Sequence, residues 1–265
     1  MAATSLELGI VLPAFLAGLL VLATHVPLGL QVLARGIVFI DLAIAQVAGL
    51  GVIVADGFGW EPQGWRVQVA ACLAALLGAL LLTWTDKRWP EVQEALIGVL
   101  FVVAASAALL MLANNPHGGE HLKDLLVGQI LWVSPASLVP VAAIYATILL
   151  LWFTLRARLG RIGFYLLFAV AVTASVQLVG VYLVFASLIV PALAARGHGT
   201  RHQLAIAYAV GVGGYAAGIV ASALFDLPTG PVIVCALTLL FIAVARRDVR
   251  TEEKESPQRH KDTKP

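Results

Sequence analysis

The run of sequence from residue 162 to residue 195, IGFYLLFAVAVTASVQLVGVYLVFASLIVPALAA, contains no charged residue. Its 34 residues exceed the roughly 20 apolar residues that one helix needs to cross a bilayer. Arg161 precedes the run and Arg196 follows it. Lys and Arg in short loops remain on the cytoplasmic side of a membrane, so both ends of the run are expected there. The run therefore either crosses twice or enters the bilayer and returns as a re-entrant hairpin.

Other apolar runs of membrane-spanning length flank this stretch on both sides. They cover residues 8–24, 31–55, 67–85, 95–113, 136–155, 204–224 and 231–244. Hydrophobic residues make up 60% of the chain and charged residues only 12%, about half the charged share of a soluble domain. The sequence predicts an all-α, polytopic integral membrane helical bundle with about eight to nine transmembrane helices.

The charged residues concentrate at the C-terminal end. Residues 246–265 hold seven Lys or Arg and five Asp or Glu, and lack apolar periodicity. We expect a transmembrane domain over 1–245 and a disordered cytoplasmic tail over 246–265. The net charge is only +2 and its surplus lies in this tail, so nucleic acid is an unsuitable partner.

Basic residues mark the loops expected in the cytoplasm. These are Lys87 and Arg88; Arg156, Arg158 and Arg161; Arg196 and Arg201; and Arg246, Arg247 and Arg250. The alternate loops cover residues 56–65, 114–134 and 225–230. Lys123 is the only basic residue within these limits. This asymmetry predicts that the alternate loops face outward.

Asp41 is the only charged residue in the apolar stretch from Gly36 to Ala55. A carboxylate within hydrocarbon costs at least about 2.5 kcal/mol, so Asp41 is expected either to face a polar path or to pair with Arg35 at the interface. Gln46 is the next polar side chain, about 140° further around a helix. His25 is followed at once by Pro27 and Gly29, which predicts a helix end at the interface.

The outer loop NNPHGGEHLKDLL places His117, Glu120, His121 and Asp124 within eight residues. All four side chains are suitable ligands for a divalent metal, although a solvated polar loop would contain the same residue types. HGGEH also matches the pattern HxxEH of metalloproteases, but that motif requires a helix, and the flanking Asn, Pro and Gly residues disrupt one. No GxSxG, HExxH or P-loop motif is present, so no enzymatic activity is predicted.

Several stretches together resemble the membrane permease of ABC-type divalent-metal importers, the zinc, manganese and iron family. They are HGGEHLKDLLVGQILWVS from His117, FYLLFAVAVTASVQLVGVYLVFASLIVPALAAR from Phe164, DLPTGPVIV from Asp226, and EVQEALIG with Glu91 and Glu94. The resemblance covers roughly residues 25–245. It implies a multi-pass subunit of the bacterial inner membrane that imports Zn, Mn or Fe.

The resemblance also implies partners. They are a cytoplasmic ATP-binding subunit that hydrolyses ATP, an extracytoplasmic solute-binding protein, and a second copy of the chain in a homodimer within the lipid bilayer. No cofactor bound by this chain is expected, and the divalent metal is its cargo. A stand-alone secondary transporter or facilitator for a metal ion or another small solute is the alternative.

Two departures from the family pattern affect the expected sites. The second span of the family carries a GDALSH-like sequence whose acidic and histidine side chains meet the metal, and here it reads FIDLAIAQ. Asp41 occupies the acidic position, whereas the histidine position falls on Ala45, beside Gln46. The family also has a longer cytoplasmic segment that docks onto the ATPase between the fifth and sixth spans. Here that segment is only residues 156–163, so Arg156, Arg158 and Arg161 are the expected coupling residues.

Overall fold

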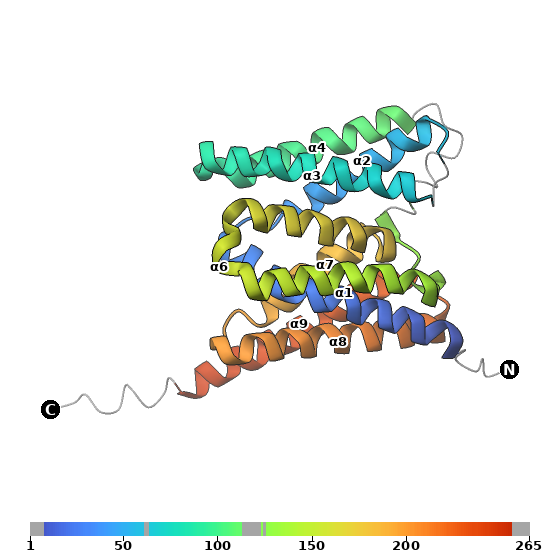
Figure 1. Ribbon diagram of the computed structural model, residues 1–265. Coiled ribbons are helices and arrows are strands. Elements are labelled where there is room, and N and C mark those ends of the chain that lie inside the picture. Colours follow the sequence, from blue (N-terminus) through green and yellow to red (C-terminus); the bar gives the residue numbers. More distant parts are fainter. Residues whose placement is uncertain (1–7, 61–63, 113–122, 124–125, 256–265) are drawn as a thin grey trace.

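The computed structural model describes residues 8–60, 64–112, 123 and 126–255, and within them the chain is all-α (Figure 1). The long helices are α1 (Leu8–Arg35), α2 (Ile40–Gly57), α3 (Trp65–Arg88), α4 (Gln93–Leu112), α6 (Pro135–Val179), α8 (Thr200–Phe225) and α9 (Thr229–Glu255). The short elements are α7 (Val181–Ala194) and the 3-10 turns η1 (Pro90–Val92) and η2 (Ile130–Trp132). Eight helical segments among these residues are long and apolar enough to cross a membrane, which confirms the predicted polytopic bundle.

The uncharged run at 162–195 forms one full span and a shorter returning helix. The span is Arg158–Val179, the second half of α6, and α7 returns with 14 residues. At 1.5 Å per residue, α7 is about 21 Å long, which is less than the roughly 30 Å of a hydrocarbon core. Gly180 separates the two helices with φ 82° and ψ 160°, a backbone conformation open essentially to glycine alone. The run thus forms a full-length apolar helix followed by a shorter returning helix, an arrangement that both expected alternatives share.

One end of the bundle holds the connections that contain or adjoin Arg35, Lys87, Arg88 and Arg196, and is called here the basic end. The α1–α2, α3–α4 and α7–α8 connections meet there, on the left in Figure 1. The bend of α6 also lies there. It falls at Gly160, whose φ of 56° and ψ of −154° divide α6 into two helical segments. Arg161 ties this bend to α3, because its guanidinium lies 3.3 Å from the Asp86 carboxylate and donates to the Asp86 carbonyl oxygen at 3.0 Å.

Helix α1 passes through His25 without a break, so the predicted helix end at this histidine was wrong. Pro27 has no N–H to donate to the carbonyl of Ala23 four residues before it. The hydroxyl of Tyr208 on α8 donates to that carbonyl oxygen at 3.1 Å. Gly29 lets α1 contact α7 so closely that any side chain there would overlap the Leu188 carbonyl oxygen. Contacts with distant helices therefore stabilise a segment whose local sequence is typical of a helix end.

Tyr208→Phe is expected to destabilise the chain by about 1 kcal/mol, because it leaves the partly buried Ala23 carbonyl without a donor. In a Pro27→Ala background the same change should cost almost nothing, because alanine at that position restores the helical N–H donor. Thermal unfolding of the four variants in one detergent measures this double-mutant cycle. Equal costs in both backgrounds would show that the hydroxyl does not compensate for the proline.

Helix α9 extends to Glu255, so ten residues of the segment predicted as a disordered tail are helical. No Gly or Pro interrupts the sequence between Pro231 and Pro257, and Arg, Glu and Lys are good helix formers. Residues 256–265 lie outside the described part of the chain, and the boundary of the membrane domain at residue 245 remains a prediction.

Candidate functional site

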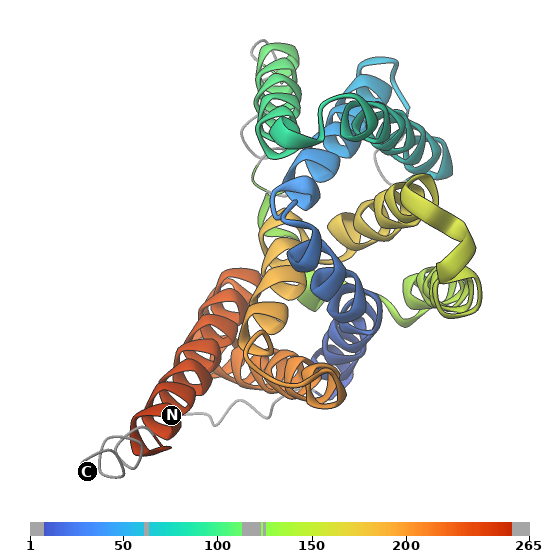
Figure 2. The same cartoon turned by 90° about the vertical axis from the view of Figure 1, so that its left-hand side faces the viewer.

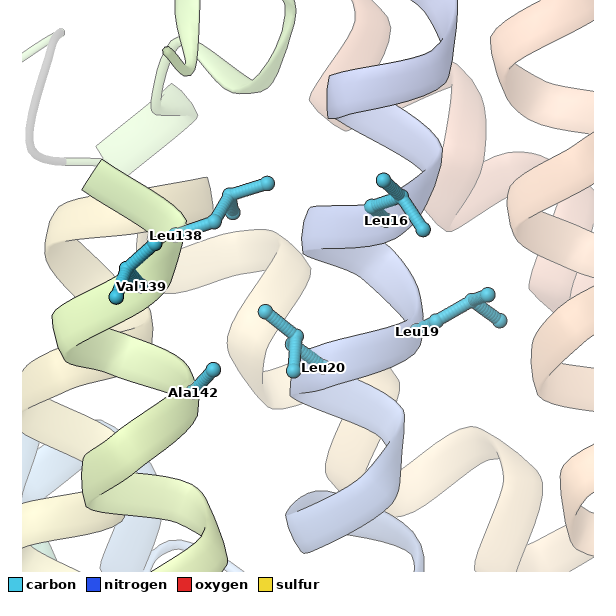
Figure 3. A pocket seen from close by; sticks show the side chains of 6 residues that line it. All are labelled: Leu16, Leu19, Leu20, Leu138, Val139 and Ala142. Atoms are coloured by element: carbon cyan, nitrogen blue, oxygen red, sulfur yellow. The ribbon is translucent and has the colours of Figure 1, made fainter. Parts of the chain in front are cut away.

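An apolar groove lies between α1 and the first half of α6 (Figure 3). It measures about 340 Å³. Its lining consists of Leu16, Leu19, Leu20, Leu138, Val139 and Ala142. None of these side chains offers a ligand atom for a metal ion. A metal ion would therefore have to bind polar groups elsewhere, inside the bundle.

Asp41 is one of these groups. It lies in the first turn of α2 with a side chain that is 0% exposed, and no described residue donates a hydrogen bond to either carboxylate oxygen. The interfacial pairing with Arg35 is not observed as a hydrogen bond, and the Arg35 guanidinium lies over the ring of Phe164, 4.1 Å from its centroid. A carboxylate buried in this way has both oxygens open to a ligand that the described residues do not supply.

Glu94 holds the turn that carries Asp41. Its Oε1 accepts a hydrogen bond from the backbone N–H of Phe39, the residue that caps α2, at 3.2 Å. Beside it, buried Gln93 donates to the Leu82 carbonyl oxygen at 3.0 Å and accepts from the Thr85 hydroxyl at 2.9 Å. These contacts join the first turn of α4 to α2 and α3. Sequence reasoning noted Glu94 only for its resemblance to the family segment, because a cap supplied 55 residues away leaves no local pattern.

Gln46 lies about one and a half turns further along α2, at a different site from Asp41. It borders a small cavity of about 10 Å³ between α2, α4 and the break at Gly180. The lining residues are Ala45, Gln46, Gly49, Ile53, Ala108, Leu126, Val176 and Val181. The amide of Gln46 is the one polar side chain in this lining, and Asp41 is not part of it. The structure thus places Asp41 and Gln46 on one helix without bringing them together.

The predicted outer-loop ligands His117, Glu120, His121 and Asp124 all lie outside the described residues. Within the described ranges, no three His, Cys, Asp or Glu side chains gather into a group that could hold a metal ion. Among the described residues, Asp41 is therefore not part of such a group.

The predicted coupling residues lie at the bend of α6. Arg158 is exposed and Arg161 is held by Asp86, while the side chain of Arg156 is outside the described part. Arg161 therefore links α6 to α3 at the basic end. The side chain of Arg158 is exposed on the surface of the chain.

The described part of the chain combines eight apolar spans with a buried carboxylate that has no hydrogen-bond partner among the described residues, as in a multi-pass membrane protein with a candidate ion path. The ABC 3 transport family matches residues 7–164 and 154–247 of the sequence. The chain belongs to this family.

Three comparisons show what the chain is similar to. The manganese transport system membrane protein MntC of Bacillus subtilis is 29% identical over 86% of this chain, which spans 58% of MntC's length. The high-affinity zinc uptake system membrane protein ZnuB of Haemophilus influenzae is 21% identical over 90% of this chain and 98% of its own. A chain in the structure of PsaBC from Streptococcus pneumoniae has the same fold, with a TM-score of 0.73, 18% identity, and coverage of 90% of this chain and 91% of that one.

Proposed function

We propose that this chain is the membrane-spanning permease subunit of an ATP-driven importer of divalent metal ions, with zinc or manganese as the cargo. The observation that carries the proposal is the Asp41 carboxylate, buried in a membrane span with both oxygens unpartnered among the described residues. Family membership and relatives named for manganese and zinc transport support the same cargo. The protein would reside in the bacterial inner membrane.

Asp41 is proposed as the principal ligand along the path. A carboxylate suits Mn²⁺ and also binds Zn²⁺, and it would attract either ion into a region of low dielectric constant. Gln46 is proposed to line a later part of the path, where its amide borders the cavity beside Gly180. The cation enters and leaves, so neither residue needs to complete a permanent coordination shell.

Energy is proposed to come from a separate cytoplasmic ATP-binding subunit, since this sequence carries no P-loop. An extracytoplasmic solute-binding protein would deliver the metal, and two copies of the chain would form the pore. Arg158, exposed at the basic end, and Arg156 are the proposed contacts with the ATPase, while Arg161 holds the bend that presents them.

Co-purification tests this assembly. The tagged chain, expressed with the ATP-binding subunit of its own operon, should retain that subunit in detergent, and Arg158→Glu should weaken the retention. Glu91→Gln, an exposed change that removes a charge at the same end, is the control. A chain that takes up metal while retaining no ATPase would instead be a stand-alone facilitator.

The outer loop is proposed to receive the metal from the binding protein. Changing His117 and His121 together to Ala should raise the metal concentration for half-maximal uptake several-fold, with little effect at saturation. Neutral imidazole is the form that binds metal and its reference pKa is about 6.5, so the parent's advantage should shrink as external pH falls toward about 5.5. Identical uptake curves for parent and variant at limiting metal would leave the loop without this role.

A further inference from the structure

His25 is a buried ionisable residue that the proposed function does not use. Its side chain is 0% exposed within α1. Its Nδ1 lies 3.0 Å from the carbonyl oxygen of Val21, and its Nε2 has no hydrogen-bond partner among the described residues. A polar atom buried in a membrane span without a partner costs free energy. A ligand bound to Nε2 would remove this cost.

The contact with Val21 indicates which nitrogen is available. A carbonyl oxygen only accepts hydrogen bonds, so this contact is a hydrogen bond in the tautomer that carries the proton on Nδ1 and a lone pair on Nε2. The Thr24 hydroxyl oxygen lies 3.0 Å from the same Nδ1. The hydroxyl of Thr24 donates to the same carbonyl at 3.1 Å. Metal-bound histidines commonly show this arrangement, in which the ring N–H donates to a backbone carbonyl and the other nitrogen binds the ion. The backbone of α1 therefore already orients the ring for ligation.

The position of His25 on α1 places it at an interface that contains other polar groups. Gly18, Leu22, His25 and Gly29 share one helical face through their spacing of four, three and four. Gly18 contacts the ring of Tyr215 and Gly29 contacts the Leu188 carbonyl, so this face packs against α8 and α7. Figure 2 shows α1 between these helices and α6. The hydroxyls of Ser187 and Tyr215 lie 2.8 Å apart in the same interface, fully buried.

We propose that Nε2 of His25 is a ligand of the transported divalent cation, at a second position along the path from the Asp41 carboxylate. This inference rests on the proposed import function. Imidazole favours Zn²⁺ over harder cations such as Mn²⁺, so His25 should contribute more to zinc transport than to manganese transport.

Two substitutions separate the ligand from its hydrogen bond. In His25→Asn the amide nitrogen takes the place of Nδ1 and can still donate to Val21, but nothing replaces Nε2. In His25→Gln the longer side chain brings an amide oxygen towards the position of Nε2. Uptake of Zn²⁺ and Mn²⁺ is measured in cells expressing the full chain with its ATPase and binding protein. His202→Asn, at an exposed position on α8, is the matched control.

His25→Asn should raise the Zn²⁺ concentration for half-maximal uptake at least about tenfold, with a smaller shift for Mn²⁺, and His25→Gln should recover part of the loss. A structural role would alter both metals equally. An Asn variant that matches the parent for both metals, or that loses both in proportion, overturns the proposal.

Binding by the purified full chain keeps this result separate from the proposed function. Co²⁺ serves as the probe, because its visible absorption reports nitrogen ligation. Absorption lost in His25→Asn supports the proposal even if the parent transports nothing, an outcome that would reject only the import function. If neither variant accumulates, diethyl pyrocarbonate labelling of the unmodified chain decides the matter. Zn²⁺ should slow the modification of His25, and an unchanged rate contradicts ligation.

Discussion

Asp41→Asn should lower metal uptake roughly 100-fold or more while leaving the chain folded in the membrane. The substitution keeps the side-chain volume but removes both the negative charge and one strong oxygen ligand. Stability should not suffer, because the native carboxylate is buried without a hydrogen-bond partner among the described residues and a neutral amide is cheaper to bury.

Uptake and the amount of folded protein are measured together in cells that lack their own metal importers. Glu91→Gln is the matched control, since it removes a carboxylate that is exposed at the basic end. Near-normal uptake by Asp41→Asn would show that the charge of Asp41 is not part of the path.

Gly180→Ala should destabilise the fold by about 3 kcal/mol and sharply reduce the amount of folded protein. Alanine is strained at φ 82° and ψ 160°, and its methyl group would overlap the backbone of Gly128, which packs against the break. Relief of this overlap would require the 127–128 segment to move away from the joint between α6 and α7.

Gly98→Ala is the control for this change. Gly98 lies within α4 with open space around its Cα, so alanine there should be neutral or slightly stabilising. The apparent unfolding temperatures in one detergent provide the comparison. If Gly180→Ala unfolds at the parent's temperature, the break does not require glycine.

Hydropathy alone predicted most of the helices because membrane crossing is a requirement on local composition. The basic connections likewise meet at one end of the bundle, as the positions of Lys87, Arg161 and Arg196 predicted. The assignment of that end to the cytoplasm remains a prediction from the same residues.

His25 was misplaced because the features that decide its surroundings are distant in sequence. Pro27 and Gly29 are typical of a helix end. In the structure, the Tyr208 hydroxyl donates to the Ala23 carbonyl in place of the N–H that Pro27 lacks, and Gly29 allows α1 to contact Leu188 closely. Tertiary contacts of this kind leave no local periodicity. A buried histidine therefore could not be distinguished from an interfacial one.

Gly214 and Gly218 also make a tertiary contact that the local sequence does not indicate. With 24 glycines in the chain, a single GxxxG carries little weight as a sequence signal. In the structure, a Cβ at Gly214 would overlap Leu237 and one at Gly218 would lie 2.5 Å from the Cα of Ile233. Both glycines therefore allow α8 to pack closely on α9, a contact that depends on which helices are neighbours.

Asp41 was identified from sequence as either a path residue or half of an interfacial ion pair. The choice depended on where the helix begins and on what the connection from Arg35 does, neither of which the composition specifies. The structure starts α2 at Ile40 and buries Asp41 completely, while Arg35 lies over Phe164. These observations favour the path, and the role itself awaits the Asp41→Asn measurement.

Metal accumulation with and without the ATP-binding subunit tests the central claim most directly. Cells stripped of their own importers would express this chain and its binding protein, either with the ATPase or with an ATPase whose P-loop lysine is replaced. We predict accumulation of Zn²⁺ or Mn²⁺ only with the intact ATPase. Equal accumulation in both strains would contradict an ATP-driven permease and identify a facilitator, and accumulation in neither strain would contradict metal import.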